Sequence, residues 1–360
     1  MSLDPVYREL ARRLDEIPNG FSPTESGVEL RLLAKIFEPH EAALAAVMRL
    51  SREPYDVIAA RAGVDPQDAR ITLKTMARKG QIRAGRKEGK LAFGLMPFAV
   101  GIYEEQLPRM DVELATLFEE YYVETRGSFA RYEPALQRIL PVEEAIPVGI
   151  EIYPYEQATA LLENAQAWGV RDCICRVQQK LVGRGCDHPV EICLSFAPVP
   201  GVFDHSEATR AITKDEALAL LKQAADAGLV HSPGNFRDGN HYICNCCTCC
   251  CGVLRAVAEF GMPTAIAHSS FVAVVDETLC AGCGDCLARC QFGALSLVDD
   301  VCRVEAGRCV GCGVCAAVCP SEALSLARRP EEEILAPPAN FAEWSTRRAR
   351  ARGLDDPATT

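Results

Sequence analysis

Apolar side chains recur at helical spacing within the first hundred residues and predict three short helices. We expect these helices at residues 41–50, 55–62 and 66–79. Pro66 at the first helical position and Gly80 after the last are common start and stop signals. Within the third helix, Ala69, Leu73 and Met76 lie at i, i+4 and i+7, so their side chains are expected to face a core.

Two extended segments, 81–84 and 91–95, follow the third helix and flank the glycine- and lysine-rich stretch GRKEGK. This order of elements resembles the winged-helix domain of many bacterial regulators. The third helix carries Arg70, Lys74 and Arg78 at a spacing of four residues, which predicts three cations on its solvent face. The resemblance implies contact with DNA, but a winged helix that docks onto a protein would carry the same charges, and docking is favoured.

The pattern after this domain predicts a connector and then a small α/β unit. In the connector we expect a helix over 103–124, interrupted at Pro108, and another over 132–140. The α/β unit is expected to contain a strand at 148–152, helices at 155–169 and 214–227, and a strand at 170–176. Because side chains alternate along a strand, Cys173 and Cys175 on the last strand would face the same side.

Ten cysteines lie in this central region, six of them in the segment HYICNCCTCCCG at 241–252. The ten are Cys173, Cys175, Cys186, Cys193, Cys244, Cys246, Cys247, Cys249, Cys250 and Cys251. In an extended dense segment, one face would carry Cys244, Cys246 and Cys250, and the other Cys247, Cys249 and Cys251. Among the nearby histidines, His241 is the best candidate for a further ligand.

A cubane cluster uses four thiolates, so ten cysteines exceed the needs of two such clusters by two. The preferred assignment gives one [4Fe–4S] cluster to Cys173, Cys175, Cys186 and Cys193, or to a mixture of these with the dense segment. A second cluster, not necessarily a cubane, would use the remaining thiols. A zinc site and redox-active thiols without metal are the alternatives. The CxCR and CNCCxCCC signatures resemble a cysteine-rich module of multi-cluster proteins from anaerobic bacteria, and this likeness implies electron transfer.

Near the C-terminus, two stretches of 18 residues at an offset of 29 share 11 identical positions. Each begins with the spacing C-x2-C-x2-C-x3-C, and the second run is followed by Pro320, where the first has Gln291. This spacing resembles the bacterial ferredoxin domain with two [4Fe–4S] clusters. The resemblance implies that the fourth cysteine of each run binds the other cluster. One centre would then use Cys280, Cys283, Cys286 and Cys319, and the other Cys309, Cys312, Cys315 and Cys290.

Composition and charge narrow the class of protein. The chain has 360 residues, 19 cysteines and a net charge of −11, although residues 66–90 alone carry +6. The start of the chain does not resemble an export signal, and its longest apolar stretch, 93–103, is too short to span a bilayer. Clustered cysteines and no export signal predict metal ligands in a reducing, cytoplasmic setting. No nucleotide-binding fingerprint and no catalytic nucleophile are evident.

These observations predict a multidomain α+β protein with five segments. We expect a winged-helix-like domain (1–100), a helical connector (101–147), a cysteine-rich metal-binding module (148–270), a ferredoxin-like βαββαβ domain with two clusters (271–328) and a tail (329–360). The favoured function is the relay of single electrons to or from a partner oxidoreductase. The alternatives are an iron–sulfur redox-sensing regulator that binds DNA, and a reductase with an unusual cluster in the CNCCTCCC segment. The sequence does not predict the oligomeric state.

Overall fold

A computed structural model describes residues 4–354, which divide into two compact units. The first unit comprises the chain up to Glu133, Leu181–Gly183 and the chain from Ser345 onward. The second comprises Pro134–Lys180 and Arg184–Trp344. The expected division into five segments is finer than this separation and stays a prediction.

Helices and one small sheet make up the first unit. The helices are α1 (Val6–Asp15), α2 (Val28–Ile36), α3 (Pro39–Ala46), α4 (Tyr55–Ala62), α5 (Pro66–Arg78) and α6 (Val112–Glu124). The strands β1 (Glu53–Pro54), β2 (Ile82–Lys87) and β3 (Lys90–Leu95) pair antiparallel in the order β1-β3-β2. The predicted helices and hairpin are therefore present, and a short 3-10 helix at Glu104–Arg109 precedes α6, as the interruption at Pro108 predicted.

Helix α5 forms as its sequence pattern predicts. The side chain of Asp65 caps it by accepting hydrogen bonds from the backbone N–H groups of Gln67 and Asp68, at 2.8 and 3.2 Å. Ala69, Leu73 and Met76 are buried. The core face of α5 is thus confirmed.

The C-terminal helix α12 (Phe341–Ala351) does not present all of its arginines to solvent. Arg348 is completely buried, and its guanidinium donates hydrogen bonds to the backbone carbonyls of Pro18, Phe129 and Tyr132. Burial lowers the pKa of Arg348 to about 9. The arginines of this tail therefore do not form one solvent-facing basic patch.

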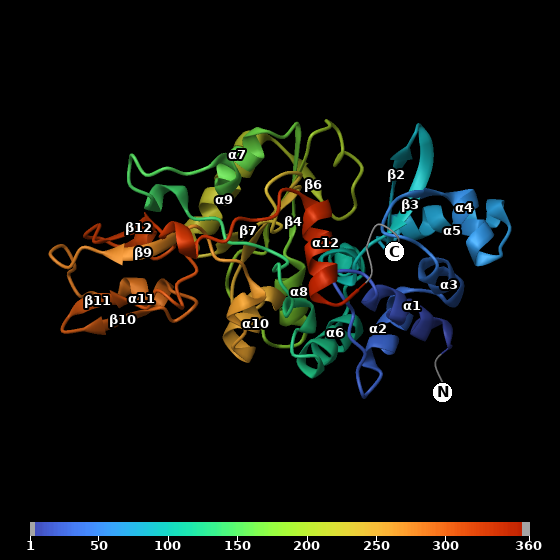
Figure 1. Cartoon of the computed structure of the whole chain (residues 1–360), viewed down its shortest axis with the longest axis horizontal. Helices are drawn as coiled ribbons and strands as arrows, with labels where there is room; N and C mark the ends of the chain where they lie inside the picture. The colour runs from blue at the N-terminus through green and yellow to red at the C-terminus, as the bar shows by residue number, and fades with distance from the viewer. Residues whose placement is uncertain (1–3, 355–360) are drawn as a thin grey trace. The chain divides into compact units, whose positions relative to one another are not determined.

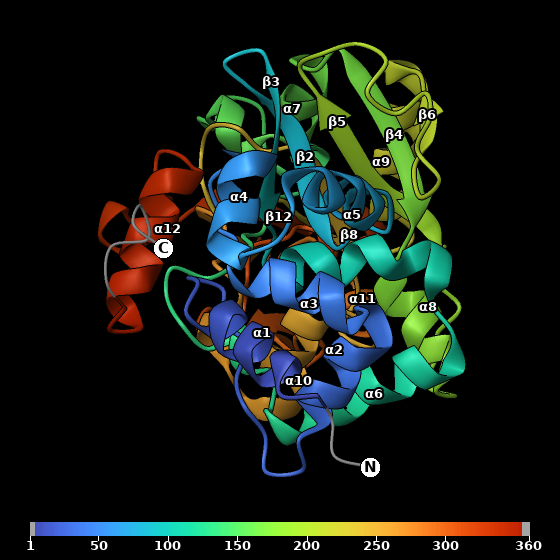
Figure 2. The same cartoon turned by 90° about the vertical axis from the view of Figure 1, so that its right-hand side faces the viewer.

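A five-stranded antiparallel sheet, in the order β6-β4-β5-β8-β7, organises the middle of the second unit. Its strands are β4 (Ala167–Asp172), β5 (Glu191–Ala197), β6 (Arg210–Ile212), β7 (Val230–Ser232) and β8 (Tyr242–Cys246). Figure 2 shows β4 and β5 side by side, with β6 beside β4. The helices around the sheet are α7 (Ala158–Glu163), α8 (Ile174–Leu181), α9 (Lys214–Asp226) and α10 (Gly252–Phe260).

Alternation along β5 gives this sheet two chemically different faces. Leu194 and Phe196 share a hydrophobic core with Leu162 of α7 and Leu221 of α9. Ile243 of β8 pairs with Leu194 and joins the same core. Because neighbouring residues on a strand face opposite sides, the cysteines that alternate with these apolar residues lie on the other face.

Three expectations for this region are wrong. No strand forms at 148–152, where Val148 is exposed and Gly149 has a positive φ of 95°. Residues 132–140 are not helical: they form bends and isolated bridges, such as the one between Leu140 and His231. The strand expected at 170–176 ends at Asp172.

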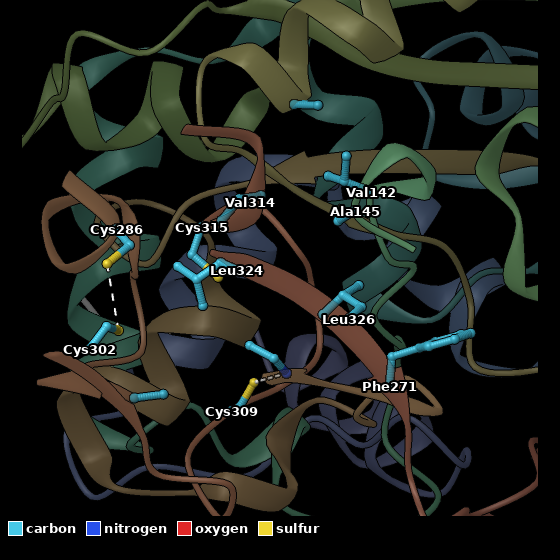
Figure 3. Close-up of a cluster of buried hydrophobic side chains, with 13 residues drawn as sticks. Val142, Ala145, Phe271, Cys286, Cys302, Cys309, Val314, Cys315, Leu324 and Leu326 are labelled. Carbon is cyan, nitrogen blue, oxygen red and sulfur yellow. Dashed lines mark hydrogen bonds between the residues drawn. The ribbon is translucent and has the colours of Figure 1, made fainter. Parts of the chain in front are cut away.

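The last part of the second unit contains two antiparallel strand pairs (Figure 1). Strand β9 (Phe271–Val275) pairs with β12 (Leu324–Arg328), and β10 (Leu295–Val298) pairs with β11 (Val301–Val304). Helix α11 (Asp285–Arg289) follows the first cysteine loop, and a 3-10 turn at Ala316–Val318 follows the second. Figure 3 shows part of the core between these elements, which includes Phe271, Leu324 and Leu326 together with cysteine side chains.

Candidate metal centres

The first cavity of the C-terminal region is surrounded by sulfur. Three of its lining cysteines, Cys280, Cys283 and Cys286, belong to the first run, and Cys319 ends the second. Cys302 of β11 also lines the cavity, and its thiol lies 3.6 Å from the sulfur of Cys286 (Figure 3). The structure therefore gathers four thiols from two distant loops around one space.

The second cavity has the reciprocal composition. Cys309, Cys312 and Cys315 of the second run line it, together with Cys290, the last cysteine of the first run. Each cavity thus takes three cysteines from one run and the fourth from the other. Four soft sulfur donors around an enclosed space suit an iron–sulfur cluster.

Backbone N–H groups point at several of these sulfurs. Cys302 donates to the sulfur of Cys280 at 3.3 Å, Ala294 to that of Cys290 at 3.4 Å, and Ala273 to that of Cys309 at 3.5 Å. Such hydrogen bonds stabilise negative charge on thiolate sulfur. They would favour the reduced, more negative form of a cluster held in either cavity.

The ten central cysteines form two groups, each of which mixes cysteines of the dense segment with earlier ones. Cys186, Cys247, Cys249 and Cys250, here called the four-thiol site, have sulfurs that all lie within 4.8 Å of one another. The other six form the six-thiol ring, in which the pKa of each thiol is shifted mainly by the two thiols next to it. The order around the ring is Cys173, Cys175, Cys251, Cys246, Cys244 and Cys193.

The strands explain half of the six-thiol ring. On β5 the side chain of Cys193 faces the side opposite to that of its neighbour Leu194. Leu194 pairs with Ile243, so one residue further along this antiparallel pairing Cys193 lies opposite Cys244. Cys246 lies two residues further along β8 and so faces the same side as Cys244. The remaining members come from element ends, since Cys251 precedes α10 and Cys175 lies in the first turn of α8.

The pKa shifts alternate around the six-thiol ring. Hydrogen bonds from neighbouring thiols lower the pKa of Cys173, Cys251 and Cys244, the last to about 5. The same contacts raise the pKa of the three thiols between them. The six thiols therefore share their protons as one set, and the thiolate is the form that binds metal.

Arg176 supplies positive charge beside these sulfurs. It is 2% exposed, and its guanidinium donates one hydrogen bond to the backbone carbonyl of Asn245 at 2.8 Å. Two of its nitrogens, Nε and Nη1, have no hydrogen-bond partner among the described residues. Burial disfavours this cation, but nearby cysteine sulfurs, Cys173 and Cys247 foremost, offset that effect and raise its pKa. A buried cation of this kind requires nearby negative charge.

Two sequence expectations about the ligands are corrected. Cys173 follows β4 and Cys175 lies in α8, so the pair reaches the six-thiol ring from a strand–helix junction rather than from one strand face. Cys186 joins Cys247, Cys249 and Cys250, in line with the mixture that the sequence analysis left open. The chain turns after Cys246, so Cys250 and Cys251 exchange the sides that an extended segment would give them.

His188 contacts a cysteine sulfur. Its Nδ1 lies 3.4 Å from the sulfur of Cys186, whereas His241 is exposed and packs edge-on against Tyr242. The C-x-H spacing at 186–188 could have drawn attention to His188, but loop geometry, not sequence, decides such a contact.

Comparison with known proteins assigns part of this region. Residues 302–325 match the family model of a 4Fe-4S binding domain. No curated protein and no solved structure matches the chain. Within residues 4–354, the helices are all too short or too polar to cross a membrane. The chain therefore contains a 4Fe-4S binding domain and many further cysteines, which is the composition of an iron–sulfur protein capable of electron transfer.

Proposed function

We propose that this protein is a multi-cluster electron carrier that passes single electrons to or from a partner oxidoreductase. The observation that carries the proposal is the reciprocal composition of the two C-terminal cavities. In this proposal Cys280, Cys283, Cys286 and Cys319 hold one [4Fe–4S] cluster. Cys309, Cys312, Cys315 and Cys290 hold the other. A bound cubane gains or loses one electron without a change of ligands.

The residues around the cavities are suited to this task. Glycines in the cysteine loops let the backbone approach closely, and Gly311 has a φ of 72°. The N–H groups of Ala273, Ala294 and Cys302 already point at cysteine sulfur. Since these donors are part of paired strands or tight loops, they need little rearrangement when the charge changes. Such rigidity favours rapid electron exchange.

A third centre is proposed at the six-thiol ring. Six thiolates exceed the four that a cubane uses, which favours a polynuclear iron–sulfur cluster of another type. Among the described residues, no three of these sulfurs form a group as compact as the four-thiol site, so a single ion would not reach all six. Arg176 would offset the negative charge of such a cluster.

Two cysteine variants test the reciprocal ligand sets. Cys283→Ser should change the EPR signal of one C-terminal centre, and Cys312→Ser that of the other, in protein prepared without oxygen. Cys302→Ser is the control, because Cys302 lines the first cavity but lies outside both proposed ligand sets. Equal loss of both signals in each variant, with Cys302→Ser unchanged, would refute the assignment.

For the first unit we propose docking to the redox partner. Arg70 and Arg78 of α5 are exposed, and the guanidinium carbon of Arg70 lies 5.7 Å from the ring centre of Tyr55. Partner binding that weakens in Arg70→Ala/Arg78→Ala would support docking. A sequence-specific gel shift at physiological salt would instead favour the alternative of an iron–sulfur regulator that binds DNA.

A further inference from the structure

We infer that the four-thiol site binds one thiophilic metal ion, zinc or iron, and not a cluster. This centre would be separate from the two C-terminal clusters and from the six-thiol ring. The inference does not depend on the proposed electron relay, because a single-ion site can be structural or redox-active.

The sulfur separations carry this inference. Cys186 lies 3.5 Å from Cys250 and 4.0 Å from Cys247, and Cys249 lies 3.9 Å from Cys250, measured between sulfurs. A tetrahedral ion with metal–sulfur bonds of about 2.3 Å requires sulfurs roughly 3.8 Å apart. The observed separations therefore suit four thiolates that share one ion.

The C-terminal cysteines provide an internal comparison. In a cubane each thiolate binds a different iron, so the cysteine sulfurs surround the whole cluster and lie farther apart than around one ion. Among residues 4–354, the four-thiol site is the only group of three or more such ligand atoms within 4.8 Å of one another. The eight C-terminal cysteines line cavities instead. The same chain thus shows two distinct sulfur spacings.

Local structure explains how one short segment supplies three of the ligands. After β8 the chain turns, and the N–H groups of Cys250 and Cys251 donate to the carbonyl of Cys247 at 3.4 and 3.0 Å. This turn folds Cys247, Cys249 and Cys250 toward one point. Cys186 completes the set from the loop after α8, and Nδ1 of His188 lies beside its sulfur. A histidine at this position suits hydrogen bonding to a ligand sulfur.

One cysteine of the four-thiol site is exposed to solvent, and its loop makes a hydrogen bond to the C-terminal region. Cys249 is exposed, whereas Cys247 and Cys250 are buried. The N–H of Thr248 donates to Oε1 of Gln291 at 2.7 Å. Gln291 directly follows Cys290, and it replaces the proline that follows the equivalent Cys319. A proline side chain could not accept this hydrogen bond, which explains why the first run has a glutamine where the second has a proline.

The test is a count of metal and acid-labile sulfide in the full-length protein, purified without oxygen. Cys186→Ser/Cys250→Ser should lose about one zinc or iron per chain and no sulfide, because a single ion contains no bridging sulfide. Thr209→Ser, at a buried position of the same unit outside every sulfur site, is the control and should lose neither. Unchanged EPR signals from the C-terminal centres would show that the double variant remains folded.

Two results would overturn the inference. One is the loss of several irons together with a similar amount of sulfide, which would mean a cluster at this site. The other is unchanged metal content in the folded double variant. If the wild-type protein shows no C-terminal EPR signals, the proposed electron relay fails. Near-ultraviolet circular dichroism then reports whether the double variant is folded. The metal count at the four-thiol site remains a separate result.

Discussion

At the residue scale, buried charges in this protein are satisfied in two different ways. Glu41 is 1% exposed and accepts hydrogen bonds from Nζ of Lys79 at 2.7 Å and from Nε2 of Gln81 at 2.8 Å. Arg176 is also buried, but its guanidinium donates to one backbone carbonyl, and two of its nitrogens have no hydrogen-bond partner among the described residues. The charge of Glu41 is paired within the protein, whereas the charge of Arg176 lies beside cysteine sulfurs, whose negative charge would offset it.

Glu41 makes the first unit sensitive to acid. Burial acts to raise its pKa, but the hydrogen bonds of Lys79 and Gln81 outweigh burial and lower it below the usual 4.5. Because the folded state binds this proton less readily than the unfolded state, the stabilisation is present above pH 4.5 and is lost as pH falls through the lowered value. Hydrogen exchange in α3 and α5 should therefore accelerate below that pH.

Replacing Glu41 with glutamine should remove the same stabilisation at neutral pH. We expect a loss of about 2–3 kcal/mol, which corresponds to at least roughly thirtyfold faster exchange of the protected α3 and α5 amides. Glu9→Gln is the control, because Glu9 is exposed on α1. Equal protection in Glu41→Gln and Glu9→Gln would contradict this account.

Arg176→Met tests the charge beside the six-thiol ring. The methionine preserves much of the apolar volume but removes the cation, so the thiolates lose electrostatic support. Acid-labile sulfide and iron should fall by the content of the ring centre. Lys180→Met, at an exposed position on the same helix, should retain both. Wild-type sulfide in Arg176→Met would contradict the proposed role.

At the element scale, tight loops rather than helices set the positions of the thiols. Gly311 and Gly284 both have positive φ, at 72° and 82°. Gly311 lies in the second cysteine run and Gly284 in the first, at different positions of the repeat. A Cβ at Gly311 would lie 2.0 Å from the carbonyl oxygen of Phe271 at the start of β9. A Cβ at Gly284 would meet nothing closer than 3.8 Å, in the side chain of Leu297.

This difference predicts unequal effects of two alanine substitutions. Both alanines bear the backbone strain of positive φ, about 1–2 kcal/mol. Only Gly311→Ala also forces the second cysteine loop away from β9. We expect Gly311→Ala to lose the second C-terminal centre in EPR and iron content, and Gly284→Ala to retain both centres. The account fails if the two variants behave alike.

Sequence could predict the C-terminal sites better than the central ones, for reasons that lie in local structure. In the repeat, fixed spacing and loop glycines determine which thiols can meet. In the dense segment, alternation holds only as far as Cys246, where β8 ends and the turn begins. The strand–helix junction at Cys173 and the arrival of Cys186 from a distant loop depend on tertiary packing. Hydrophobic periodicity does not report either feature.

At the scale of the whole molecule, the second unit concentrates all of the cysteines into neighbouring sulfur-rich sites. The C-terminal cavities, the six-thiol ring and the four-thiol site all lie within this unit. Gln291, next to Cys290 of the second cavity, accepts a hydrogen bond from Thr248 of the four-thiol site's loop and donates one to the carbonyl of Gly228.

An anaerobic reductive titration of the full-length protein, followed by EPR and paired with iron and sulfide analysis, tests the central claim most directly. We predict reversible uptake of about two electrons by the C-terminal centres. Their share of the inorganic content should be about eight irons and eight sulfides per chain. Further iron and sulfide would come from the six-thiol ring. A colourless protein that holds zinc, contains no sulfide and accepts no electrons would contradict the account.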